Sequence, residues 1–425
     1  MFGNFNRNAA YGNGKRKRLP VFSIALVLCY LAVAVLFFMY GFGDGRAAQE
    51  PAAEVVAVTP TPTPTPETTP EPEAPEPIPL PPPVKVKGIW VGAWFIVEEG
   101  LLDSYIELCE TTEVNTLVFD IKEEHGYVTI PMESDVYPVS QNILIEDMGE
   151  LIADLKSRDI YTIARVVCFK DSRRSARYPE TAHRDSDGKV WQDARGYGWL
   201  NPYVRDNWDY IAELCLEAAR LGFDEIQLDY VRFPVEGALS DIDSGRMDDE
   251  RSRTEVIAEF VSFIRDTMLE VGVRTSADVF GIIGLSGTDS ENVRLLGQDL
   301  DKLFSAVHYI SPMIYPSHFA NINQNGTGQV INGILFETPD KKPYEVIYNT
   351  LQHFIQRRDP NDPNKAIIRP YLQDFTAGYL GEGMYISYGP DEVRAQIDAV
   401  YAAGLDEWLL WSNTSNYTME TFTNP

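Results

Sequence analysis

Residues 223–234 have the sequence FDEIQLDYVRFP, which is typical of a buried β-strand that ends at a proline. Side chains alternate between the two faces of a strand, so Gln227 and Asp229 are expected on one face and Leu228 and Tyr230 on the other. An acid at the carboxyl end of such a strand is placed either to perform chemistry or only to cap the next helix. The rest of the chain favours the first interpretation.

Strand-like and helix-like patterns alternate through most of the chain. The predicted strands are 88–95, 115–122, 161–169, 224–233, 274–281, 309–315, 366–375 and 407–412. The predicted helices lie near 101–111, 146–158, 204–221, 250–271, 293–306, 344–358 and 390–403. Eight strands separated by seven helices predict an α/β fold, a closed parallel (β/α)8 TIM barrel. A doubly wound open sheet is the alternative, but the chain has no glycine-rich nucleotide loop at a switch point.

A membrane anchor is predicted ahead of the barrel. Residues 1–20 are basic without one acid, and residues 21–42 are apolar or aromatic except for Ser23 and Gly41. This length matches the roughly 20 residues that a helix needs to cross a bilayer, so we expect an uncleaved transmembrane signal anchor. The basic segment should remain in the cytoplasm by the positive-inside rule.

A spacer should separate the anchor from the barrel. Residues 43–85 are rich in Pro, Thr and Glu, a composition that predicts a disordered linker with extended polyproline conformation. Residues 86–425 then form the barrel domain. The expected arrangement is a single-pass protein of the cell membrane with its barrel domain extracellular.

Charge and cysteine content exclude several classes of function. The formal net charge is −27, and stripes of Lys and Arg that bind nucleic-acid phosphates are lacking, so we expect no nucleic-acid partner. Cys109, Cys168 and Cys215 fall inside apolar patterns and are expected as buried thiols. The five histidines lack the spacing of a zinc site, so we expect no metal and no cofactor.

Acids end several of the predicted strands. A parallel barrel builds its active site at the carboxyl ends of the strands. Cleavage of a glycosidic bond needs two carboxyl groups about 5–9.5 Å apart around a sugar, and Asp229, Asp278 and Asp374 are the acids best placed for it. Taken singly, Asp278 and Asp374 could equally be strand-end carboxylates bonded to loop amides. The three together favour chemistry.

Polar and aromatic side chains at the same strand ends are candidates for binding a sugar, because rings stack on sugar faces while polar groups bond the hydroxyls. Lys122 should point the same way as Asp120 if the strand persists, and it would pair with a barrel carboxylate or bind a hydroxyl. The predicted substrate-binding residues are Trp94, Asp120, Lys122, Arg165, Gln227, Arg232, Tyr315, His318, Gln373 and Trp411.

Four segments of the chain resemble the putative glycosyl hydrolase domain family of bacterial proteins. They are 222–234, 276–281, 310–319 and 369–375, and they occur in the order of strands four to seven. The resemblance covers about residues 86–415. It implies a TIM barrel related to the α-amylase superfamily.

The resemblance also implies roles for the three acids. Asp229 would be the nucleophile, Asp278 the proton donor and Asp374 the residue that holds the distorted sugar. Two positions depart from the amylase pattern: Gln227 stands where the amylases have Arg, and strand five offers Asp in place of Glu.

The sequence thus predicts a membrane-anchored extracellular glycoside hydrolase. Its partners would be a cell-envelope or environmental polysaccharide, or a peptidoglycan-associated glycan, together with the membrane bound through residues 21–42. A barrel that has lost catalysis and binds glycan as an envelope scaffold is the alternative.

Overall fold

The computed structural model describes residues 78–132, 142–243, 249–362 and 364–423. The predicted anchor at 21–42, the basic segment before it and most of the linker lie outside the described residues. In the described part, none of the helices combines the length and the apolar composition that crossing a membrane requires.

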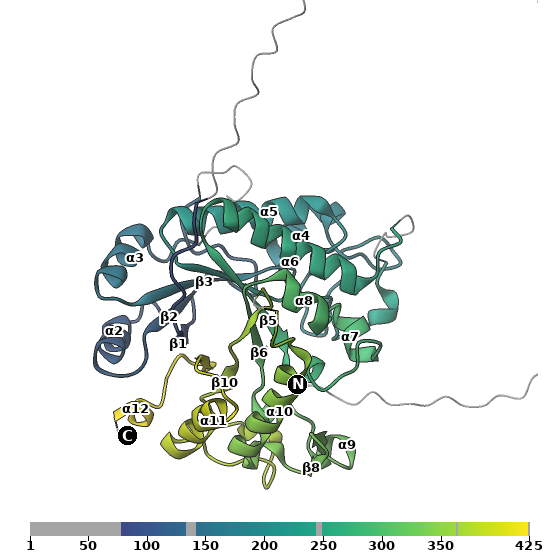
Figure 1. Ribbon diagram of the computed structural model, residues 1–425. Coiled ribbons are helices and arrows are strands. Elements are labelled where there is room, and N and C mark those ends of the chain that lie inside the picture. The colour runs from purple at the N-terminus through teal and green to yellow at the C-terminus, as the bar shows by residue number, and fades with distance from the viewer. Residues whose placement is uncertain (1–77, 133–141, 244–248, 363, 424–425) are drawn as a thin grey trace, which may run out of the picture. The chain divides into compact units, whose positions relative to one another are not determined.

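A closed parallel β-barrel forms the centre of the domain (Figure 1). Neighbouring strands pair in chain order from β1 to β6, the short strands β9 and β10 share the seventh position, and β11 closes the ring against β1. The barrel strands are β1 (Lys87–Val91), β2 (Thr116–Lys122), β3 (Tyr161–Val167), β4 (Glu225–Asp229), β5 (Arg274–Phe280), β6 (Tyr309–Met313), β9 (Ile367–Ile368), β10 (Tyr371–Gln373) and β11 (Trp408–Trp411). The predicted TIM barrel is confirmed, and the open sheet is excluded because the ring closes.

Helices surround the barrel and connect consecutive strands (Figure 1). The longer ones are α2 (Leu101–Thr111), α3 (Met148–Ser157), α5 (Arg205–Arg220), α6 (Arg253–Glu270), α10 (Pro343–Arg357) and α11 (Pro390–Ala402). The shorter ones are α4 (Ser172–Arg177), α7 (Glu291–Leu296), α8 (Leu300–Ala306), α9 (Ile322–Asn325) and α12 (Glu420–Thr423). The pattern near 293–306 therefore makes two short helices, because Gly297 adopts a left-handed conformation and ends α7. A hairpin of β7 (Gln329–Ile331) and β8 (Ile334–Phe336) follows β6.

Two predicted strands are shorter than expected for identifiable reasons. Strand β4 ends at Asp229 because Tyr230 has a positive φ of 49°, which turns the chain out of the sheet. The seventh strand is interrupted at Pro370, which has no N–H to donate to a neighbouring strand.

The core has two parts. Apolar residues between the strands and the helices form the larger one, and a smaller cluster that includes Val118, Ile163 and Leu409 fills the barrel. Below the carboxyl ends of the strands, Arg369 forms a fully buried ion pair with Glu225 inside the barrel. All three cysteines are free thiols, as predicted; Cys168 and Cys215 are buried as expected, whereas Cys109 is only partly buried.

Candidate active site

A cavity of about 390 Å³ opens at the carboxyl ends of the strands. Its walls come from β3 to β6, from β10 and β11, and from the loops after them. Most of the catalytic and binding residues predicted from the sequence take part. Those that line the cavity are Arg165, Asp229, Arg232, Asp278, Tyr315, His318 and Trp411.

Asp229 is the last residue of β4, and Asp278 lies at the same height on the neighbouring strand β5, two residues before its end. The register pairs Gln227 with Ser276 and Leu228 with Ala277, so the next step along both strands brings the two acids side by side. Paired strands lie about 4.8 Å apart. Asp229 is 6% exposed and Asp278 is 1% exposed, and both line the same cavity.

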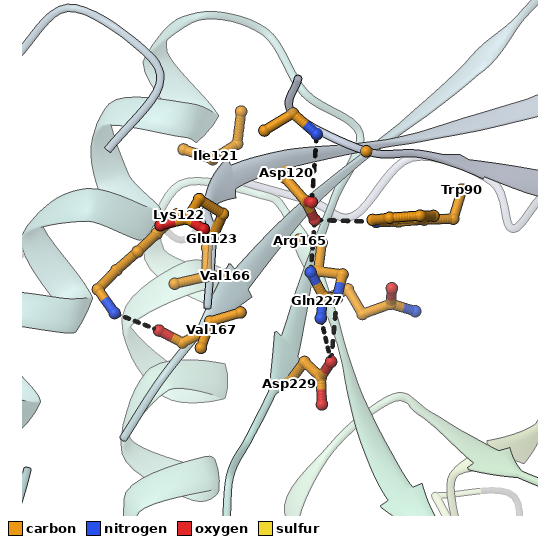
Figure 2. Close-up of polar contacts among 12 residues, drawn as sticks. Trp90, Asp120, Ile121, Lys122, Glu123, Arg165, Val166, Val167, Gln227 and Asp229 are labelled. Atoms are coloured by element: carbon orange, nitrogen blue, oxygen red, sulfur yellow. Dashed lines mark hydrogen bonds and ion pairs between the residues drawn. The ribbon is translucent and has the colours of Figure 1, made fainter. Parts of the chain in front are cut away.

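Arg165 on β3 links the carboxylate of Asp120 on β2 to that of Asp229 on β4, as Figure 2 shows. Its Nε donates to Asp229 Oδ2 at 3.0 Å, its Nη2 donates to the same oxygen, and its Nη1 donates to Asp120 Oδ1 at 2.5 Å. The Tyr230 backbone N–H donates to Asp229 Oδ1 at 2.5 Å. This set of donors stabilises a carboxylate anion at Asp229 and holds it in one orientation.

Asp278 has the opposite environment. Burial, followed by the negative charge of Asp229, raises the pKa of Asp278 well above its ordinary value. Its Oδ1 has no hydrogen-bond partner among the described residues. A carboxyl whose raised pKa favours its protonated form, beside a second carboxyl held by cationic and N–H donors, suits general acid catalysis.

Aromatic rings form one wall of the cavity. The ring centroids of Tyr315 and Trp411 are 5.4 Å apart and the rings are stacked, and Trp199 and Tyr371 also line the space. Trp199 comes from the insertion after β3, where its Nε1 donates to Asp193 at 3.0 Å. Flat aromatic surface beside buried acids suits a sugar ring.

Asp374 does not converge on the cavity with the other two acids. It accepts hydrogen bonds from the backbone N and Oγ1 of Thr418 at 2.9 and 2.6 Å. Burial raises the pKa of Asp374, and these hydrogen bonds oppose the rise. Asp374 therefore has the geometry of a strand-end carboxylate that fastens the C-terminal segment, the alternative left open by the sequence.

Lys122 points away from the cavity, contrary to the expectation that it follows Asp120 (Figure 2). The pairing of β2 with β3 shifts register between Asp120 and Lys122, and such a bulge turns the next side chain to the other face. The fully buried Lys122 ammonium lies 3.0 Å from Asp171 and donates to the Val167 carbonyl at 2.7 Å.

The other predicted binding residues support the cavity or lie outside it. Gln227 accepts from the Tyr371 hydroxyl at 2.7 Å beneath the cavity, and Gln373 Nε2 donates to Asp340 at 3.0 Å. Asp120, whose pKa burial raises, also accepts from Trp90 Nε1 at 2.9 Å. Trp94 is 47% exposed and is absent from the cavity wall.

Sequence reasoning missed several residues that line the cavity. Glu124 and Lys170 form an ion pair of 3.1 Å at its edge. Burial alone would raise the pKa of Glu124, but the charges of Lys170 and Arg165 bring it below its ordinary value. Both residues stand just after predicted strands two and three, which is the signal that could have identified them. Within the described ranges, no group of His, Cys, Asp and Glu has the arrangement of a metal site.

Several solved structures are similar to this chain, and the second of the three described next shares its fold. A hypothetical protein from Ruminiclostridium thermocellum ATCC 27405 is 32% identical, with 45% of this chain and 97% of that chain covered and a TM-score of 0.41. The PgaB (BpsB) glycoside hydrolase domain from Bordetella bronchiseptica is 11% identical, with 78% and 95% covered and a TM-score of 0.51. The spore cortex-lytic enzyme SleL from Bacillus megaterium QM B1551 is 10% identical, with 81% and 74% covered and a TM-score of 0.45.

No curated protein matches the chain. The sequence model of one family, described as "Putative glycosyl hydrolase domain", matches residues 88–417, which span the barrel from its first strand to beyond its last. The chain therefore belongs to the putative glycosyl hydrolase domain family, as the strand segments predicted.

Proposed function

We propose that this protein is a glycoside hydrolase in which Asp278 donates the proton and Asp229 acts as the nucleophile or base. The observation that carries the proposal is the pairing of these acids at adjacent strand ends in one cavity, with opposite electrostatic environments. Membership of the family supports the reaction class.

The reaction follows from the two environments. Asp278 protonates the glycosidic oxygen as the bond to the leaving sugar breaks, and Asp229 faces the positive charge that develops on the sugar ring. Arg165 touches no reacting atom in this scheme and acts as a positioning residue, since it fixes the Asp229 carboxylate through two hydrogen bonds. Tyr315 and Trp411 provide the surface for the ring.

The separation of the two carboxyl groups predicts whether the anomeric configuration of the sugar is retained or inverted. Retaining enzymes separate their carboxyl groups by about 5–5.5 Å and inverting enzymes by about 6.5–9.5 Å. Acids that stand side by side on strands about 4.8 Å apart favour the shorter separation, so we expect retention. Proton NMR of the first-formed anomer would show it, and initial release of the inverted anomer would contradict it.

A test of the activity uses the purified full chain with a panel of polysaccharides and peptidoglycan, and mass spectrometry of the products. Asp229→Asn and Asp278→Asn should each lower the rate of product formation by about 100-fold or more. Asp224→Asn is the matched control, because Asp224 precedes the same strand at the opposite end of the barrel and bonds Thr162. Binding of glycan without any product from the unaltered protein would instead support the scaffold alternative.

We also propose that residues 21–42 anchor the protein in the cell membrane, with the barrel outside and a cell-envelope or environmental polysaccharide as substrate. The support is the apolar run behind a basic segment and ahead of a proline-rich spacer. Protease added to intact cells should release the barrel and leave the first residues in the membrane fraction. A barrel that resists protease until the cells are lysed would overturn this placement.

A further inference from the structure

Three buried cationic side chains line the cavity, and two of them, Arg165 and Lys170, form ion pairs with carboxylates. Arg165 binds Asp120 and Asp229, and Lys170 binds Glu124. Arg232 is 8% exposed and forms no ion pair with any carboxylate of the described residues. A buried charge without a counter-ion is unfavourable, so its presence requires another explanation.

Aromatic rings hold Arg232 in place. Its guanidinium carbon lies 4.8 Å from the ring centroid of Trp199, 5.1 Å from that of Tyr230 and 4.7 Å from that of Phe280. These contacts offset part of the cost of burial and restrict the side chain to one conformation. Burial nevertheless lowers the pKa of Arg232, and the attraction of nearby acids only partly opposes it.

The guanidinium keeps donors available for a ligand. Nη1 donates to the Phe233 carbonyl at 3.0 Å, whereas Nε and Nη2 have no hydrogen-bond partner among the residues that the structure describes. Nε and Nη2 together form the edge with which Arg binds two oxygens of a carboxylate or a phosphate. A neutral sugar hydroxyl would accept a hydrogen bond but would bring no negative charge within ion-pair distance of this guanidinium.

We propose that Arg232 binds an anionic substituent of the sugar in the cavity, a carboxylate or a phosphate, and that the substrate is therefore an acidic glycan. This inference rests on the proposed function for its substrate class, but the binding step that it describes needs no hydrolysis. Arg232 lies just beyond Asp229 in the chain and packs on Phe280, two residues beyond Asp278, so the anionic group would sit beside the reacting sugar.

The test measures binding of simple probes to the full chain by calorimetry or ligand-observed NMR. D-glucuronate, D-galacturonate and glucose 6-phosphate are compared with neutral glucose and galactose, and the two kinds of acid distinguish a carboxylate from a phosphate. The acidic sugars should bind roughly 10- to 100-fold more tightly than the neutral ones, the range expected for one charge-assisted hydrogen-bonded pair. Equal binding of acidic and neutral sugars would overturn the inference.

Variants assign the preference to this residue. Arg232→Met should remove the preference for acidic sugars. Arg232→Lys keeps the positive charge without the pair of parallel N–H donors and should reduce that preference several-fold. The Lys variant therefore tests the inference if the Met variant does not fold. The matched control is Arg205→Met, since Arg205 also stacks on rings, Trp208 and Phe263, but lies outside the cavity. An undiminished preference in folded Arg232→Lys would refute the role of Arg232.

The outcome is separable from that of the proposed function. Hydrolysis of neutral glycans with no preference for acids would leave the hydrolase proposal standing and refute this one. Arg232-dependent binding of acidic sugars by a protein that hydrolyses no glycan would support this inference and refute the hydrolase proposal. With an active substrate, Arg232→Met should raise KM far more than it lowers kcat, because the contact is made equally in the ground state and the transition state.

Discussion

Replacing Asp278 with Asn should make the protein more stable while it removes activity. Burial and the adjacent Asp229 disfavour the charged form of Asp278, so the pKa of its carboxyl is raised well above the ordinary value of 3.8 in the folded protein. The folded state therefore retains a proton that the unfolded state has lost. Such a group contributes most to stability below its unfolded pKa, and that contribution is lost as the pH rises through its folded pKa.

The magnitude follows from linkage. Between the unfolded and the folded pKa of Asp278, the free energy of unfolding should fall by about 1.4 kcal/mol for each pH unit relative to a variant that does not titrate there. An asparagine amide has nearly the same shape and does not titrate. Loss of the general acid should lower kcat by about 100- to 10,000-fold.

Urea unfolding at about pH 4, 6 and 8 measures the effect as a difference between the two proteins, because the other titrating groups are common to both. The stability advantage of Asp278→Asn should grow from about pH 4 upward. Asp209→Asn, which removes an exposed carboxylate on helix α5, serves as the control and should show no such growth. An advantage that is independent of pH would refute the reasoning, because it would mean that Asp278 is not held protonated.

Three further predictions concern the neighbouring charges. Arg165→Met should lower the free energy of unfolding by about 3–5 kcal/mol in urea, because Asp120 and Asp229 stay buried without their cation. Lys122→Met should destabilise the protein by a similar amount for the same reason, yet leave kcat of the folded fraction nearly unchanged, since Lys122 does not line the cavity. Asp374→Asn should cost about 1 kcal/mol in a thermal melt and change kcat/KM less than tenfold, whereas a loss of activity equal to that of Asp229→Asn would give Asp374 a catalytic role.

Local patterns predicted the barrel because its strands and helices differ in the period of their apolar residues. The strand at 274–281, for example, is observed as Arg274–Phe280. Helix α6 begins after Ser252, whose side chain accepts from the Glu255 backbone N–H while Glu255 bonds back to it, a capping arrangement encoded within four residues. Features of this kind depend on neighbours in the chain and are visible in the sequence.

The side chains that lie away from the cavity, contrary to the expected placement, depend on contacts with distant segments. Lys122 leaves the cavity because β2 shifts register against β3, and no pattern within 116–122 reveals a bulge. Asp374 turns to Thr418, which lies 44 residues further along the chain. Glu124 and Lys170, which are 46 residues apart in the chain, form an ion pair that lines the cavity.

The sequence by itself determined the order of strands and helices, and through that order the edge of the barrel where chemistry is placed, because period and chain order are local properties. Only the tertiary structure decided which acids share a cavity. It placed Asp229 beside Asp278, turned Asp374 toward Thr418 and gave Arg232 no ion-pair partner among the described residues. The reason is that register between strands, burial and the pairing of charges arise only when segments far apart in the chain pack together.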